Sequence, residues 1–190
     1  MMKEIHEQPR AVKDTLNSVL KDGKFDLTDI GLAEEDIRRT SQIYIVACGS
    51  AYHVGMVAQY VIEDLVKIPV RVELASEFRY RKPILDPNGL VIIISQSGET
   101  ADSLAALRET KAQGIRTLGI VNVVGSSIAR EADKVFYTLA GPEISVATTK
   151  AYSTQLMASY ILAIQFAKVK NTITEEQYEN YIAELQAIPE

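Results

Sequence analysis

The chain has 190 residues, 47% of them hydrophobic and 24% charged, and its net charge is −5. These values are typical of one globular domain with a short extension, and they exclude a disordered, collagen-like or disulfide-rich chain. Because the balance is acidic and no run of lysine and arginine occurs, we expect no nucleic acid as a partner. We also expect no membrane association, since the apolar runs are too short to cross a bilayer and no signal peptide is present.

Cysteine and histidine are scarce. Cys48 is the only cysteine, so no intrachain disulfide can form, and His6 and His53 are the only histidines. These residues are too few to build a metal cluster of thiolates and imidazoles. The composition therefore predicts no metal site and fits the reducing environment of the cytoplasm.

Helical spacing of apolar residues predicts a first helix that begins near Pro9 and ends near Gly23, followed by a short helix over 34–39. After residue 40, short apolar runs rich in β-branched residues alternate with helical segments. The predicted strands are 43–47, 70–74, 90–94, 117–121 and 135–139. The predicted helices in this region are 52–66, 100–113, 126–131 and 149–168. A last amphipathic helix is expected over 172–185, with Thr174 as its N-cap.

Strands that alternate with helices predict right-handed crossovers and a parallel sheet. The expected fold class is α/β: a three-layer α/β/α sandwich around a five-stranded parallel sheet, flavodoxin-like, with strand order 2-1-3-4-5. We divide the chain into an N-terminal helical extension (1–40), the sandwich domain (41–170) and a C-terminal helix (171–190). Because no strand follows this last helix, we expect it to lead to a further domain that is absent here.

Two loops of small residues are expected to meet at the carboxyl edge of this sheet, after its first and third strands. They are Cys-Gly-Ser-Ala at 48–51 and Ser-Gln-Ser-Gly-Glu-Thr at 95–100. Both lead into a helix N-terminus, where unpaired N–H groups and the helix dipole favour an anion. The loops contain no lysine or arginine and match neither the P-loop nor Gly-x-Gly-x-x-Gly, so we predict a small phosphorylated metabolite. A third loop, 141–150, is expected to close the pocket from the side.

Ordinary structural roles compete with these functional ones. Hydroxyl residues such as Ser97, Thr100 and Thr148 are common helix caps. For Cys48 we favour a packed residue at a strand end over a nucleophile with His53 as its base, because their spacing is no evidence of hydrogen-bonding geometry.

Four motifs carry a family resemblance: Ala-Cys-Gly-Ser-Ala-Tyr-His (47–53), Ala-Ser-Glu-Phe-Arg-Tyr-Arg (75–81), Ser-Gln-Ser-Gly-Glu-Thr-Ala-Asp (95–102) and Val-Ala-Thr-Thr-Lys-Ala-Tyr (146–152). In this order they resemble the first sugar isomerase (SIS) domain of the glucosamine-6-phosphate synthase family. The members of that family are glutamine:fructose-6-phosphate aminotransferases (isomerizing) of hexosamine biosynthesis. The resemblance covers nearly the whole chain.

The resemblance implies that this domain binds fructose 6-phosphate or glucosamine 6-phosphate, without a cofactor. The residues expected to hold the phosphate are Ser95, Gln96, Ser97 and Thr100. Those expected to line the sugar are Cys48, Gly49 and Ser50 on one side, and Val146 and Thr148 on the other. The family usually has Thr-Ser where this chain has Ser50-Ala51, and serine where it has Thr148. The Ala51 side chain cannot donate a hydrogen bond, so any contact from that side chain is lost.

In the family, a glutaminase domain and a second SIS domain supply the catalytic groups, which have no counterpart here. We therefore expect a homodimer that binds sugar phosphate but does not isomerise it alone. Two alternatives remain open. The first is a non-catalytic sugar-phosphate sensor, which the short, acidic region before Ile43 disfavours as a DNA reader. The second is a single-domain phosphosugar isomerase, for which Glu99 is the candidate acid or base, although a first-turn helix acid is the simpler interpretation of this residue.

Overall fold

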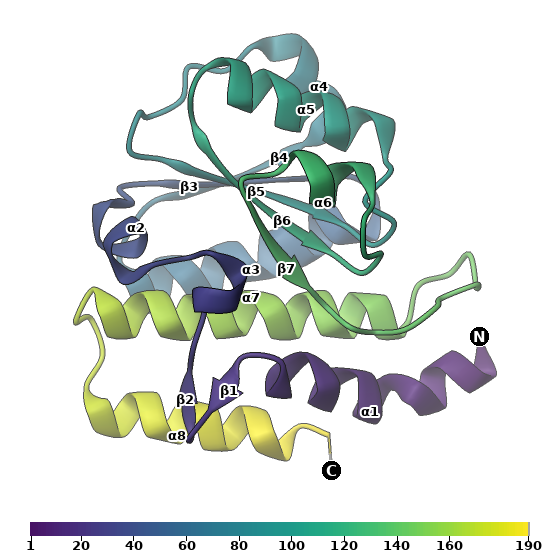
Figure 1. Ribbon diagram of the computed structural model, residues 1–190, viewed down its shortest axis with the longest axis vertical. Helices are drawn as coiled ribbons and strands as arrows, with labels where there is room; N and C mark the ends of the chain where they lie inside the picture. Colours follow the sequence, from purple (N-terminus) through teal and green to yellow (C-terminus); the bar gives the residue numbers. More distant parts are fainter. Residues whose placement is uncertain (190) are drawn as a thin grey trace.

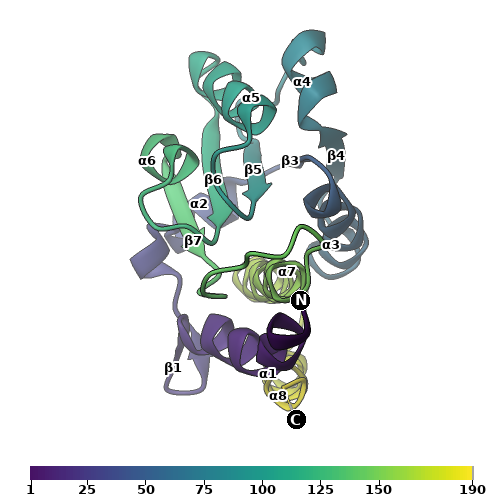
Figure 2. The same ribbon diagram turned by 90° about the vertical axis from the view of Figure 1, so that its right-hand side faces the viewer.

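The computed structural model describes residues 1–189, and a parallel sheet of five strands lies at its centre (Figures 1 and 2). The strands are β3 (Ile43–Ala47), β4 (Val70–Leu74), β5 (Leu90–Ser95), β6 (Arg116–Val121) and β7 (Lys134–Tyr137). They lie in the order β4-β3-β5-β6-β7. This is the expected 2-1-3-4-5 arrangement, so the predicted α/β fold with a five-stranded parallel sheet is confirmed.

The central strands separate two apolar cores. Ile45 of β3 lies in register with Ile92 of β5, and both point into the core on the side of the long helices. Their neighbours Val46 and Ile93 point into the core on the opposite face. Because successive residues of a strand face opposite sides, a strand buried on both faces needs an unbroken apolar run. This explains why β3 and β5 lack the polar alternation of a half-exposed strand.

Helices cover both faces of the sheet (Figure 2). On one face lie α4 (Ala75–Arg81), α5 (Ala101–Ala112) and α6 (Ser127–Glu131). The other face is covered by α3 (Ser50–Val66) and α7 (Lys150–Val169). A further helical layer, α1 (Met2–Asn17) and α8 (Glu175–Ala187), packs on the outer side of α7. Fourteen of the 20 residues of α7 are buried as a result, because this helix has neighbours on two sides.

The N-terminal region differs from its prediction. The first helix begins at Met2 and ends at Asn17, so Pro9 lies inside it. Proline lacks the N–H that would bond the Ile5 carbonyl, and Gln8 Nε2 donates to that oxygen instead, at 3.3 Å. A small hairpin, β1 (Leu20–Lys21) and β2 (Lys24–Phe25), occupies the end of the predicted helix. It is followed by the 3₁₀ turn η1 (Thr28–Ile30) and α2 (Glu34–Arg39), the second of which is predicted correctly.

The C-terminal helix begins as predicted. Thr174 is the N-cap of α8: its Oγ1 accepts from Gln177 N at 3.1 Å, and Gln177 Oε1 accepts from Thr174 N at 2.9 Å. This reciprocal pair is a capping box, and it satisfies two backbone donors. Tyr178, Ile182 and Leu185 of α8 share an apolar core with α7. None of the helices within residues 1–189 has both the length and the apolar character that a membrane span requires.

Candidate functional site

A pocket of about 310 Å³ opens at the carboxyl edge of the sheet, between the loops that follow β3 and β5. The loop before α7 forms a further wall. All nine residues predicted from the sequence line this one pocket: Cys48, Gly49, Ser50, Ser95, Gln96, Ser97, Thr100, Val146 and Thr148. The remaining lining residues are Ala51, Ile94, Glu143, Ser145 and Gln155.

The loop after β5 is shaped by its own hydroxyl groups. Ser95 Oγ, which is buried, accepts from Gly98 N and shares a hydrogen bond with Thr100 Oγ1, each at 3.1 Å. Ser97 Oγ accepts from Glu99 N at 3.2 Å. Gly98 has φ +65°, and a β-carbon there would lie 2.6 Å from Ser126 Cβ. Only glycine fits this position without displacing Ser126, and it allows the loop to turn tightly just before the N-terminus of α5.

Two helices begin at this pocket without a side-chain cap. They are α3, which follows Gly49 (φ 57°, ψ −134°), and α5, which follows Thr100. The N–H groups in the first turn of a helix have no partner within the helix, and the helix dipole adds a partial positive charge there. An anion in the pocket would therefore meet backbone donors from two helices, together with the hydroxyls of the loop after β5.

The N-terminus of α7, in contrast, is already occupied. The carboxylate of Glu143 accepts from Thr149 N at 2.8 Å, Ala151 N at 3.2 Å and Thr148 Oγ1 at 3.0 Å. Glu143 is the only charged residue among those that line the pocket. The pocket thus has uncharged hydrogen-bond donors at the N-termini of α3 and α5, and a carboxylate at the N-terminus of α7. Because the carboxylate repels negative charge, an anion binds on the side of α3 and α5.

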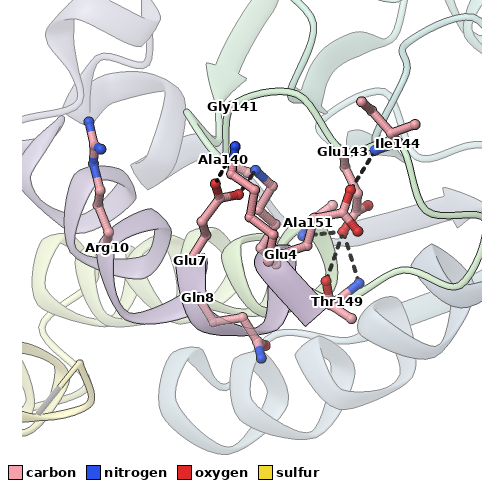
Figure 3. Close-up of polar contacts among 12 residues, drawn as sticks. Glu4, Glu7, Gln8, Arg10, Ala140, Gly141, Glu143, Ile144, Thr149 and Ala151 are labelled. Atoms are coloured by element: carbon pink, nitrogen blue, oxygen red, sulfur yellow. Dashed lines mark hydrogen bonds and ion pairs between the residues drawn. The ribbon is translucent and has the colours of Figure 1, made fainter. Parts of the chain in front are cut away.

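The loop that carries Glu143 is held in place by α1 (Figure 3). Glu4 Oε1 accepts from Ile144 N at 2.7 Å and from Ser145 N at 3.1 Å, and these bonds lower the pKa of Glu4 to about 2. Lys150 Nζ, which is buried, donates to Glu7 Oε2 at 2.7 Å and lowers the pKa of that carboxyl. The first helix of the chain therefore supports the third wall of the pocket.

Comparison with known proteins identifies the family. The model of the SIS domain family matches residues 36–165, which is more than half of the chain. The chain belongs to the SIS domain family. Such a match covers the sheet, the helices on both of its faces and all of the pocket residues, so the SIS fold and the site described here are one unit.

Relatives of this SIS domain include enzymes named glutamine–fructose-6-phosphate aminotransferase (isomerizing). The one from Clostridium tetani is 56% identical over the whole chain, and the one from Caldanaerobacter subterraneus is 54% identical. The chain spans 31% of the length of each. Among solved structures, the C-terminal domain of glucosamine-fructose-6-phosphate aminotransferase from Francisella tularensis superposes with a TM-score of 0.95 at 46% identity, over 99% of this chain and 53% of that one.

Two candidate catalytic groups lie away from the pocket of this SIS domain. His53 is exposed and packs edge-on against the Tyr52 ring, with 5.7 Å between ring centroids. Among residues 1–189 no hydrogen bond joins His53 to Cys48. Glu99 does not line the pocket, and its Oε1 accepts from Ser127 N at 2.7 Å, which lowers the pKa of the Glu99 carboxyl. His53 thus lies on a helix face, as expected. Glu99, expected as an acid in the first turn of its helix, instead precedes Thr100, the N-cap of α5, and its carboxylate bonds the first residue of α6.

Proposed function

We propose that this SIS domain binds fructose 6-phosphate and glucosamine 6-phosphate as part of a longer glutamine:fructose-6-phosphate aminotransferase (isomerizing) of hexosamine biosynthesis. The observation that carries the proposal is the pocket in which two uncapped helix N-termini and a hydroxyl-rich loop meet. The identity of 56% to an enzyme of that name supports the choice of substrate. The donors in the pocket are uncharged hydroxyl and N–H groups. They suit a hexose phosphate better than a nucleoside triphosphate, for which lysine and a metal are the usual partners.

In this proposal the phosphate binds at the loop after β5, and the sugar extends toward α7. Ser95, Gln96, Ser97 and Thr100 surround the phosphate together with the first N–H groups of α5. Cys48, Gly49 and Ser50 line one side of the sugar, and Val146 and Thr148 line the other. A phosphate placed beside Glu143 would be repelled, so the orientation follows from charge.

Isomerisation moves a proton between two neighbouring carbons of the sugar, and it requires a base within hydrogen-bond reach of that proton. The carboxylate of Glu143 is engaged by two backbone N–H groups and a hydroxyl, and neither histidine nor lysine lines the pocket within the described part of the chain. We propose that a second SIS domain of the parent chain supplies the base and that a glutaminase domain supplies ammonia. We further propose that the parent is a cytoplasmic homodimer.

Thermal unfolding of the 190-residue chain tests the binding proposal. At 100 times its dissociation constant, fructose 6-phosphate or glucosamine 6-phosphate should stabilise the fold by about 2.7 kcal/mol, whereas fructose and ATP should not. The Ser97→Ala variant should lose most of this shift because it removes a hydroxyl from the phosphate site.

Ser41→Ala is the matched control, since Ser41 is exposed, lies before β3 at the opposite edge of the sheet, and is absent from the pocket lining. It should keep the full shift. Equal shifts with ATP and with sugar phosphates, or no shift with any sugar phosphate, would contradict the proposed function.

A further inference from the structure

Gln155 is a buried polar residue of the pocket, on the helix α7 that lies between two layers of the fold. It lies in the second turn of α7, is 3% exposed and lines the pocket. Its backbone carbonyl accepts from Ser159 Oγ at 2.9 Å. Its side-chain amide, however, has no hydrogen-bond partner among residues 1–189. An amide offers two donors and an acceptor, and leaving them unpaired in a protein interior is costly.

The amide of Gln155 is not fully enclosed by protein, and the residue lines the pocket. The described side-chain atoms that are both fully enclosed and unpaired belong to Glu4, Ser103 and Ser126. Gln155 is not one of these residues, so its unpaired amide retains contact with the pocket despite the burial of the residue as a whole. A group placed in this way can bond to a molecule that enters the pocket, and it is already held in position by the packing of α7.

The position of Gln155 separates it from the phosphate. The donors suited to an anion begin at α3 and α5, whereas Gln155 lies on α7, whose N-terminus Glu143 occupies. The partner of the amide is therefore the uncharged end of the ligand. A sugar hydroxyl both donates and accepts hydrogen bonds, and an amide can match either direction.

We propose that Gln155 is a sugar-recognition residue, whose amide hydrogen-bonds a hydroxyl of the bound sugar and so favours a sugar phosphate over inorganic phosphate. This inference rests on the proposed function. It distinguishes two parts of one pocket: the loop after β5 binds the phosphate, and Gln155 selects what is attached to it. A buried hydroxyl-binding group rejects ligands that lack the hydroxyl, because its own polar atoms are then left unpaired.

Calorimetric titration of the 190-residue chain with fructose 6-phosphate and with inorganic phosphate tests the assignment. Gln155→Met keeps the length of the side chain and removes the amide. We expect the dissociation constant for fructose 6-phosphate to rise about tenfold, and that for inorganic phosphate to change less than twofold. The ligand-free melting temperature should not fall, because the amide has no partner in the protein to lose.

Gln165→Met is the matched control, since it makes the same change in the same helix at a residue outside the pocket lining. Its Oε1 accepts from Tyr178 Oη at 3.0 Å, so this variant should lose stability while keeping both affinities. Gln155→Ala is a second variant in case methionine disturbs the packing.

The outcomes separate the two proposals. If the unaltered chain binds no sugar phosphate, the proposed function fails and the assignment of Gln155 fails with it. If the unaltered chain binds fructose 6-phosphate and both Gln155 variants bind it equally well, the assignment alone is wrong. An equal loss of affinity for both ligands, or a marked drop in the ligand-free melting temperature of Gln155→Met, would assign Gln155 a structural role instead.

Discussion

Gly98 is the residue on which the shape of the loop after β5 depends most directly. An added β-carbon would meet Ser126 Cβ at 2.6 Å, and the φ of +65° is itself unfavourable for other residues. We expect Gly98→Ala to lower the free energy of unfolding by about 2–4 kcal/mol, since strain and overpacking add. Urea unfolding measures this value.

Gly114→Ala is the matched control for this prediction. Gly114 also has a positive φ, +72°, but no atom lies within 4 Å of an added β-carbon. It should lose about 1–2 kcal/mol, which is the cost of the backbone conformation alone. Equal losses in the two variants would show that contact with Ser126 does not restrict the loop.

At the same scale, the pocket residues differ in how they could be predicted. Serine, threonine and glycine directly after strands are a local signal, and this signal covers Gly49, Ser50, Ser95, Ser97 and Thr100. The other four predicted residues rest on the family resemblance, and the structure brings all nine into one pocket. Glu143 gives no such signal, because it caps α7 from a loop position six residues before Thr149, the N-cap itself. A glutamine in a helix is usually expected to face solvent. Gln155 is buried only because α7 packs between two layers, which the local sequence does not indicate.

Among the elements, α1 is bonded to the loop before α7 by a carboxylate, and we expect low pH to weaken this contact. The pKa of Glu4 falls from 4.5 to about 2, because the carboxylate accepts from Ile144 N and Ser145 N. A lowered pKa stabilises the folded loop above pH 4.5, and this contribution is lost as the pH falls from 4.5 toward 2. Amide exchange at Ile144 and Ser145 should therefore accelerate across this range relative to Glu4→Gln, in which this dependence is absent. Identical pH profiles for the two proteins would contradict the prediction.

The elements with regular patterns were predicted best. The strands are confirmed to within a few residues because buried parallel strands need continuous apolar runs. The start of α1 was predicted wrongly because proline inside a helix is rare, and the compensating bond from Gln8 to Ile5 O is not a pattern that spacing reveals. The hairpin of β1 and β2 turns at Asp22-Gly23. Asp-Gly is a known signal for a hairpin turn, but the helical spacing of the apolar residues before it favoured a longer helix.

For the whole molecule, we predict a homodimer. Tyr60 is 75% exposed, and it lines, together with Leu65, Tyr160 and Ile164, a groove between α3, α7 and α8. Apolar side chains grouped in this way favour association, and a symmetric pair is its commonest form. Light scattering should give about twice the chain mass of 21.0 kDa. A mass of one chain at every concentration tested would show that the prediction is wrong.

The hydrogen bonds between α1 and the loop before α7 also bear on the order of folding events during synthesis of the chain. Glu4 is made before its partner Ile144, which is 140 residues further along the chain. At about 5–20 residues per second, the ribosome needs roughly 7–28 s to make that stretch. During this interval α1 exists without the loop that it will hold. The loop wall of the pocket can therefore be fixed to α1 only after the stretch up to Ile144 has been made.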